Sequence, residues 1–238
     1  RIRGDFLNTT ACLCGNRFGR GLLRPGGTAY DLDADGCADM LARLKAAGRD
    51  VRGAVDVMLH TESVLERLTG TGYVSRENAQ NLGLVGMAAR ACGLKVDARF
   101  HFPLADLPTR DCAPRVETTG DVLARTLVRS KEIDDSLRLL EADISTLASL
   151  PPLAEQPDAE ALASLPPDTL AVSQVEGWRG EICHVAVTGP DGRFLTYKAI
   201  DPSFHNWPGL AMALRGNQIS DFPLCNKSFN LSYCGHDL

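Results

Sequence analysis

The feature that most constrains the fold is a stripe of mostly apolar side chains in the middle of the chain. Between Asp121 and Leu150 these side chains recur at steps of three and four, the spacing of one face of an α-helix. Pro151 and Pro152 follow directly and end the pattern. The sequence therefore predicts one long bundle helix over 121–150. The stripe comprises Leu123, Leu127, Ser130, Ile133, Leu137, Leu140, Ile144 and Leu147.

The opposite side of this predicted helix is charged. It carries Arg125, Arg129, Lys131, Glu132 and Asp135. A charged face opposite an apolar stripe is typical of a helix that packs on one side and meets water on the other. We therefore predict that these five side chains are solvated.

Other segments show helical spacing or turn residues. Residues 1–15 have the character of the end of a helix, 35–68 carry an apolar face, and Ser75 can cap a short helix. Three segments rich in Gly, Pro or Asp are expected to form or end in loops: 17–32, 101–120 and 151–170.

The segment 176–210 predicts a β-hairpin followed by a helix. Gly-Pro-Asp-Gly at 189–192 supplies the turn. Asp201, Pro202 and Ser203 end the second strand and can cap a helix over 204–214. A last short helix is expected over 220–228. The side chains expected to share one face of the hairpin are Cys183, Val185 and Val187 with Leu195, Tyr197 and Ala199.

Together these patterns predict a mainly α fold, a bundle of long antiparallel helices that carries one small antiparallel β-hairpin. We expect residues 1–150 to form the helical bundle and residues 151–238 to add the hairpin and the C-terminal helices to the same core. The chain opens with Arg1 in place of Met, so we expect one domain that is a fragment of a larger subunit.

Composition excludes several classes of function. The net charge of the 238 residues is −5 and no basic face dominates, which argues against a nucleic-acid partner. No run approaches the roughly 18 to 20 apolar residues that a membrane span needs. The eight cysteines are irregularly spaced, so we expect mostly buried thiols in a reducing compartment. Cys12 and Cys14 have no matching second pair, so no structural zinc site is expected.

Four segments in a fixed order resemble a known superfamily: CGNRFGRGLLRPGG at 14–27, then 70–99, 120–140 and 175–210. The superfamily comprises the large subunit of nickel–iron hydrogenases and the 49-kDa-type subunit of respiratory complex I. The nearest branch is the large subunit of formate-hydrogenlyase or hydrogenase-4-type complexes. The resemblance covers about Gly15 to Leu238 and corresponds to the C-terminal half of a family member. It implies a hydrogenase large-subunit-like fold.

The resemblance also implies site residues. Glu176 and Arg179 match the Glu-x-x-Arg-Gly of hydrogenases, whose arginine points at the diatomic ligands of the iron. Arg179 and Glu176 are therefore candidate catalytic residues that line a cavity. The alternative is a structural ion pair of Arg179 with Glu176 or Glu181.

Two further residues are candidates for cofactor binding. Arg90 stands in Arg-Ala-Cys-Gly, which matches the family's Arg-Ala-Ser-Gly, and His205 stands at the predicted start of a helix. For Arg90 the alternative is a buried salt-bridge network between helices. For His205 the alternative is a capping or packing role.

The C-terminal tail departs from the hydrogenase pattern. Hydrogenases end in Asp-Pro-Cys-x-x-Cys, whose two thiolates bind the nickel–iron centre. The resemblance places Ser232 and Gly235 at those positions. Cys225 and Cys234 cannot replace the pair, because they stand nine residues apart rather than three. We therefore expect no metal site, no nickel–iron centre and no cofactor bound by this chain, with quinone as a candidate ligand.

Three functions remain open at this stage. The favoured one is a subunit of a complex I-like or hydrogenase-like membrane-associated oxidoreductase of the NADH:quinone oxidoreductase type, inactive as a single chain. The alternatives are a degenerate scaffold subunit and a true nickel–iron hydrogenase. The resemblance implies as partners an iron–sulfur small subunit that carries the clusters, membrane-arm subunits and the N-terminal half of the same subunit. It implies a cytoplasmic location, peripheral on the inner face of the cytoplasmic membrane.

Overall fold

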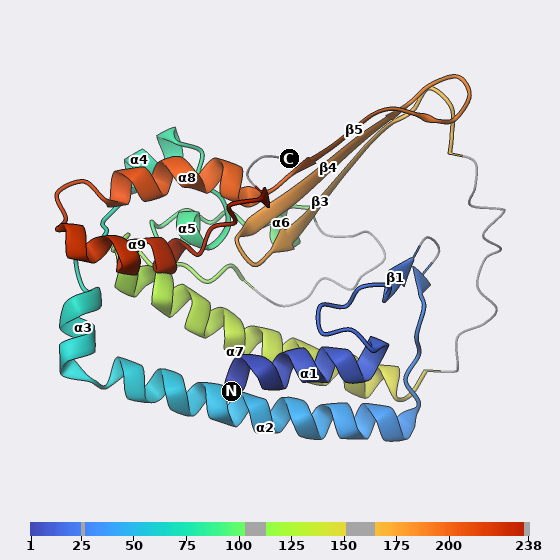
Figure 1. Ribbon diagram of the computed structural model, residues 1–238, viewed down its shortest axis with the longest axis horizontal. Coiled ribbons are helices and arrows are strands. Elements are labelled where there is room, and N and C mark those ends of the chain that lie inside the picture. Colours follow the sequence, from blue (N-terminus) through green and yellow to red (C-terminus); the bar gives the residue numbers. More distant parts are fainter. Residues whose placement is uncertain (25–26, 103–112, 151–164, 236–238) are drawn as a thin grey trace. The chain divides into compact units, whose positions relative to one another are not determined.

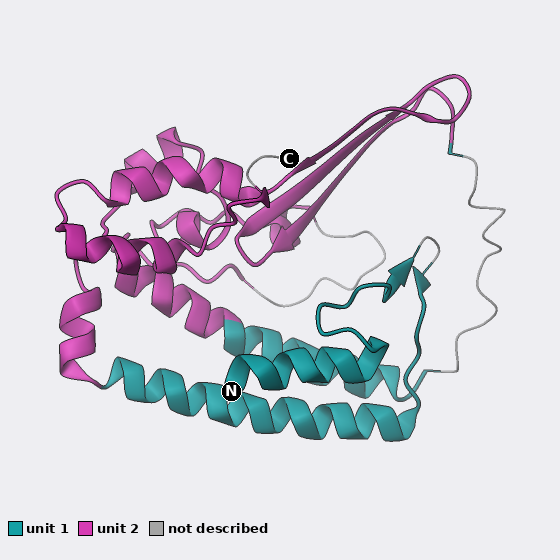
Figure 2. Cartoon of the chain, viewed as in Figure 1, with its two compact units in different colours: residues 1–60, 133–165 teal, residues 61–132, 166–238 magenta. Residues whose placement is uncertain are grey.

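The structure is a computed structural model that describes residues 1–24, 27–102, 113–150 and 165–235 (Figure 1). The chain divides into two compact units, with unit 1 comprising 1–60 and 133–165 and unit 2 comprising 61–132 and 166–238 (Figure 2). Helix α7 (Val122–Leu147) gives its first part to unit 2 and its second part to unit 1. The sequence-based boundary at 150/151 meets residues outside the described part and stays a prediction.

Unit 1 consists mainly of long helices. Helices α1 (Ile2–Cys14) and α2 (Ala34–Leu59) contact each other, and α2 runs antiparallel to the second part of α7. The antiparallel direction follows from two contacts: Gly48 lies against Leu137, and Arg52 binds Asp134 further along at 2.7 Å. The buried side chains between these helices are Cys37, Leu44, Leu137 and Ile144.

Two sequence-based expectations for this part of the chain need correction. The helical pattern over 35–68 forms two helices, because α2 ends at Leu59 and α3 begins at Glu62. The segment 17–32 contains a two-stranded antiparallel sheet, β1 (Leu23–Arg24) with β2 (Gly27–Thr28), which strands of two residues are too short to signal in sequence. The expected helix at the start of the chain is confirmed as α1.

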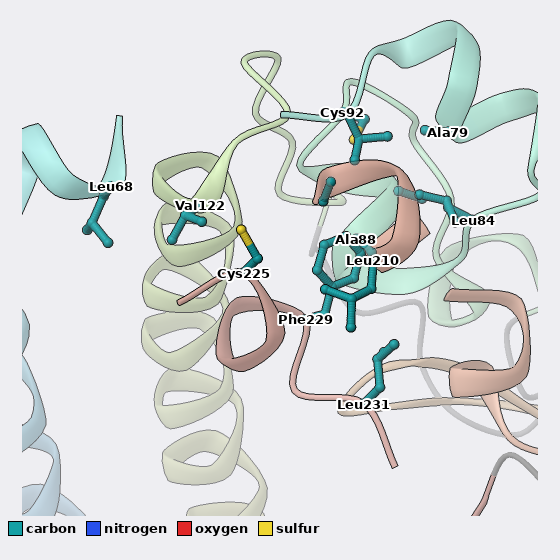
Figure 3. Close-up of a cluster of buried hydrophobic side chains, with 13 residues drawn as sticks. Leu68, Ala79, Leu84, Ala88, Cys92, Val122, Leu210, Cys225, Phe229 and Leu231 are labelled. Carbon is teal, nitrogen blue, oxygen red and sulfur yellow. The ribbon is translucent and has the colours of Figure 1, made fainter. Parts of the chain in front are cut away.

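The helices of unit 2 are short and surround one apolar core (Figure 3). Ser75 caps α4 as predicted, since its hydroxyl accepts a hydrogen bond from the Asn78 N–H at 3.1 Å. Asp201 caps α8 in the same way. Besides the first part of α7, these elements are α3 (Glu62–Leu68), α4 (Arg76–Asn81), α5 (Gly86–Arg90), α6 (Ala98–His101), α8 (Pro202–Ala213), the 3-10 turn Ile219–Asp221 and α9 (Phe222–Phe229).

The predicted hairpin is part of a three-stranded antiparallel sheet in the order β3-β4-β5. Strands β4 (Gly180–Thr188) and β5 (Phe194–Ile200) form the hairpin, and β3 (Leu170–Gly177) adds a third strand that the sequence analysis missed. The expected loop over 151–170 lies outside the described residues up to 164, and Leu170 already belongs to β3. The mainly α class with a small antiparallel β element therefore holds in outline, with a larger β part than expected.

The predicted face of the hairpin is wrong. Thr188 pairs with Phe194, but Val187 pairs with Thr196, so Leu195 is an extra residue in a β-bulge. Without that bulge Val185 would pair with Tyr197, as the sequence analysis assumed. With it Val185 pairs with Lys198, because a shift of one residue moves every later side chain to the other face.

The charged face of α7 is also not solvated throughout. Arg125 is 0% exposed, together with its neighbours Ala124 and Val128. Its guanidinium donates three hydrogen bonds to oxygens from three segments: 2.8 Å to Ser228 Oγ, 3.0 Å to the Gly120 carbonyl and 2.7 Å to the Gly72 carbonyl. In unit 2 this face of the helix is covered by the segments that supply these oxygens, so water is excluded from it.

Arg125→Met should lower the free energy of unfolding strongly. Two backbone carbonyls and one hydroxyl would remain buried without a donor, at about 1–3 kcal/mol each. We expect a loss of about 3 kcal/mol or more in urea unfolding followed by circular dichroism. Arg193→Met is the matched control, because the Arg193 side chain is 87% exposed, and it should change the midpoint little. Equal midpoints for both variants would contradict the structural role of Arg125.

Strands β3 to β5, which we call the β-arm, extend away from the helices of unit 2 (Figure 1). Apolar side chains on both outer strands are exposed: Leu170, Val172, Val175, Phe194, Leu195 and Tyr197. Both edge strands also have one row of backbone groups that no strand pairs within the described residues. Exposed apolar edge strands promote association with other chains.

We therefore expect the isolated protein to self-associate, and Val172→Lys to shift it toward the monomer. A lysine on an edge strand opposes pairing with a second strand. Val57→Lys is the control, because Val57 is similarly exposed but stands on helix α2. Light scattering over a concentration series measures the shift. A monodisperse wild-type monomer would contradict this expectation.

Candidate functional site

The turn between β3 and β4 places Arg179 at the base of the β-arm. Gly177 pairs with Gly180, so Trp178 and Arg179 form a two-residue turn. Gly180 packs directly on Gly86, where an added Cβ on Gly86 would lie 2.2 Å from the Gly180 Cα. Only two glycines allow the start of α5 and this turn to approach so closely.

Asn206 fixes the backbone of this turn. Its side-chain amide donates to the carbonyls of Arg179 at 3.1 Å and Val85 at 3.2 Å, and its oxygen accepts from the Val85 N–H at 3.0 Å. Asn206 is 1% exposed, so these bonds are shielded from water. The sequence analysis missed this residue, although it stands directly after the candidate His205.

The Arg179 side chain does not form the ion pair considered as its structural alternative. Its Nε donates to the carbonyl of Asn230, at the C-terminal end of α9. Among the described residues, its two terminal nitrogens make no hydrogen bond or ion pair. The side chain is only partly buried, so these nitrogens remain accessible to another group.

Glu176 is unavailable to Arg179 because both of its oxygens are engaged elsewhere. One accepts from Arg90 Nη1 at 2.8 Å, and the other accepts from the Ala98 N–H at 3.0 Å. Its side chain is 3% exposed. Glu176 and Arg179 are therefore neighbours in sequence whose charges are used separately.

Arg90 lies at the centre of a buried network of charges, which the sequence analysis had considered as its structural alternative. Its side chain is 2% exposed and also pairs with Glu132 at 2.7 Å and Asp97 at 3.5 Å. Arg99 binds the same Asp97 at 2.6 Å. Because these carboxylates already occupy its guanidinium, Arg90 contributes to the site by holding Glu176.

The network shifts its carboxyl groups in opposite directions. Burial alone would raise the pKa of Asp97, but the hydrogen bonds from Arg99 and the charge of Arg90 outweigh it, so that pKa is lowered. Burial raises the pKa of Glu132, and Arg90 and Arg99 offset this only in part. Asp97 therefore favours its charged form and Glu132 its neutral form.

A second arginine lies beside the turn. Arg129 Nη2 donates to the carbonyls of Phe229 at 3.0 Å and Ser228 at 3.3 Å, and its guanidinium stacks on the Trp178 ring at 4.3 Å. Burial lowers the pKa of Arg129 to about 10; Glu132 raises it in part, and the positive charge of Arg179 adds to the lowering. Two cations thus flank the C-terminal end of α9. The sequence analysis assigned Arg129 to a solvated face, because the helical stripe gives no information on what covers the other side.

His205 is the candidate for which the structure gives the least chemistry. It stands in the first turns of α8, half-buried, with its ring edge-on to Phe204 at 5.5 Å. No hydrogen bond of its ring is recorded within the described ranges. A cofactor contact of Arg90 or His205 stays a prediction.

Two broader features concern metals and membranes. In the described part of the chain no three His, Cys, Asp or Glu side chains come together as metal ligands would. None of the helices described is both long enough and apolar enough to cross a bilayer. Cavities of about 430 and 600 Å³ are lined by residues of unit 1, such as Arg43 and Asp33, and none of the site residues above lines them.

Known proteins resemble this chain over nearly its whole length. Hydrogenase-4 component G and formate hydrogenlyase subunit 5 of Escherichia coli are 29% and 28% identical to it over 233 residues. These alignments cover 98% of this chain but only 38% and 40% of those proteins. An NADH-quinone oxidoreductase subunit of Bacillus mycoides is 30% identical over 232 residues, covering 93% of this chain and 60% of its own length. The chain therefore spans between about two fifths and three fifths of these relatives.

A solved structure and a family model complete the comparison. A chain of the membrane-bound sulfane sulfur reductase, an archaeal respiratory membrane complex, superposes with a TM-score of 0.84 over 100% of this chain and 65% of its own length. Its sequence identity is 24%, so it supports the fold alone. The family model of the 49-kDa subunit of respiratory-chain NADH dehydrogenase matches residues 1–163. The resemblance inferred from the motifs is confirmed, and the chain belongs to the family of the respiratory-chain NADH dehydrogenase 49-kDa subunit.

Proposed function

We propose that the protein is part of a membrane-associated oxidoreductase related to complex I and to hydrogenases, and that Arg179 contacts the substrate in the assembled complex. Relatives named as subunits of NADH-quinone oxidoreductase and of formate hydrogenlyase support this proposal. Because the chain spans only part of these relatives, the activity belongs to the assembly rather than to this chain alone. We further propose the fold of a hydrogenase large subunit for the complete protein.

The observation that carries the proposal is the state of Arg179. A cation buried among protein groups normally finds a carboxylate, and Glu176 stands three residues away in sequence. Glu176 is bound to Arg90 and Ala98 instead, which leaves the terminal nitrogens of Arg179 without a protein partner among the described residues. A guanidinium held by its Nε alone, with its outer N–H groups accessible, suits an oxygen acceptor on a ligand.

A nickel–iron centre does not fit the residues at the C-terminus. Ser232 and Gly235 supply no thiolate at the two positions that correspond to the hydrogenase ligands. Cys225 is 0% exposed in the apolar core, and burial raises the pKa of its thiol. A metal ligand must be a thiolate, so a buried thiol with a raised pKa is a poor substitute. Hydrogenase chemistry is therefore not part of the proposal.

A quinone is the substrate class that best matches an unpaired guanidinium without a metal. Its reduction to a quinol takes two electrons and two protons at two carbonyl oxygens. We propose that Arg179 donates hydrogen bonds to one of these oxygens and stabilises the negative charge that develops there. Arginine keeps its proton at any working pH, so it holds the oxygen and does not supply the protons.

The proposed assembly supplies the other parts of the reaction. The electrons would come from the clusters of an iron–sulfur subunit, and membrane subunits would hold the complex at the inner face of the cytoplasmic membrane. The exposed β-arm and the subunit names of the relatives support the presence of partner subunits. The alternative of a non-catalytic scaffold keeps the same partners but assigns no role in turnover to Arg179.

The first test is the metal content of the protein purified together with its native partner subunits. We expect no nickel by elemental mass spectrometry, with any iron accounted for by partner subunits, because Ser232 and Gly235 offer no thiolates. Treatment with a nickel chelator should then leave quinone reduction unchanged. One nickel per complex would overturn the assignment and return the protein to the hydrogenases.

The second test is Arg179→Ala in the complex. We expect quinone reduction to fall by roughly 100-fold, as for the removal of one donor to a developing negative charge, while the complex still assembles. Arg179→Lys should restore activity only in part, because lysine keeps the charge but loses the planar fork of donors.

Arg193→Ala is the matched control, since this arginine of the same sheet is 87% exposed, and it should leave turnover unchanged. Loss of assembly in Arg179→Ala, or full turnover by the assembled variant, would favour the scaffold over the catalytic assignment.

A further inference from the structure

The C-terminal segment 230–235 is fastened to the start of helix α8. The Ser232 N–H donates to the Ser203 hydroxyl at 2.9 Å, and Trp207 Nε1 donates to the Ser232 carbonyl at 3.3 Å. Ser203 is 0% exposed and Leu231 is 6% exposed, so the fastening is anchored in the core of unit 2.

Tyr233 extends this attachment to α9. Its ring lies 5.1 Å from that of Trp207, and its hydroxyl accepts a hydrogen bond from Asn226 Nδ2 at 3.1 Å. The segment is thus held by both C-terminal helices, which fixes where its last described residue lies.

Gly235 lies in a space that has no room for a side chain. Its N–H donates to the Ser232 hydroxyl at 2.9 Å, which closes a tight turn. A Cβ added to Gly235 would lie 2.5 Å from Asp201 Oδ2 and 2.9 Å from Ser232 Oγ. Atoms of real side chains do not approach one another so closely, so one of the two neighbours would have to move.

Asp201 cannot move without a cost to α8. Its Oδ1 accepts a hydrogen bond from the Ser203 N–H at 2.7 Å and caps the helix. Rotation of the carboxylate away from Gly235 would break that bond. The cap of α8 and the absence of a side chain at position 235 are therefore coupled.

We infer that the tail 230–235 is a structural fastening in which the Asp201 carboxylate occupies the space of a side chain at position 235. This inference rests on the proposed function, in which the two positions that correspond to the hydrogenase thiolates hold no metal. It goes further, because it says that the place is filled rather than merely stripped of ligands. A cysteine restored at position 235 alone would displace the cap of α8 instead of recreating a ligand.

A double-mutant cycle on the full chain tests the coupling through thermal melting. Gly235→Ala should lower the Tm by about 4 °C or more, since its Cβ meets the Asp201 carboxylate. Asp201→Ser should change the Tm little, because serine also caps helices but is shorter. On the Asp201→Ser background, Gly235→Ala should lower the Tm by less than half as much as in the wild type.

The control is Gly53→Ala, at a helical glycine whose added Cβ meets nothing within 4 Å, and it should leave the Tm unchanged or raise it. An equal loss from Gly235→Ala on both backgrounds, or no loss on either, would overturn the inference. Its failure can be told from failure of the proposed function, because that function falls only if nickel is found in the wild-type complex.

Discussion

The packing of unit 2 depends on one buried positive charge. Arg125 has no carboxylate within ion-pair distance among the described residues, and its charge is met by three neutral oxygens and by the face of the Phe229 ring at 4.4 Å. Burial lowers its pKa to about 10, so the guanidinium still carries its proton at neutral pH. A buried charge is tolerated only when every donor finds an acceptor. The loop around Gly72, the start of α7 and the end of α9 must therefore come together around this one side chain.

A second set of buried charges determines what the candidate site can do. Arg90 draws in Glu176 and Glu132, and Glu176 in turn holds the N-terminal end of α6 through Ala98. A consequence is that Arg179 keeps a charge with no carboxylate partner in the described structure. The same network thus has a structural role and leaves a cation accessible beside the β-arm. Both arginines of the resemblance are in place, but they contribute in different ways.

The extent to which sequence reasoning succeeded follows from how local each signal is. The bounds of α7 and the caps at Ser75 and Asp201 were predictable, because helical spacing and capping act over a few residues. The register of the hairpin was not, since a bulge at Leu195 leaves no mark in the residue pattern. Of the site residues, Arg179 and Arg90 were found through the resemblance. Asn206 and Arg129 were missed, because their roles arise from segments that are distant in sequence.

The sequence by itself determined the family, the long helix α7, the hairpin turn and the lack of a thiolate pair at Ser232 and Gly235. These properties depend on residue identity and on spacing along the chain. Only the tertiary structure decided that Glu176 binds Arg90 rather than Arg179, that Arg125 is buried, and that Asp201 fills the space beside Gly235. The physical reason is that a charge selects its partner by distance and by exclusion from water, and both are set by the folding of segments that lie far apart in the chain.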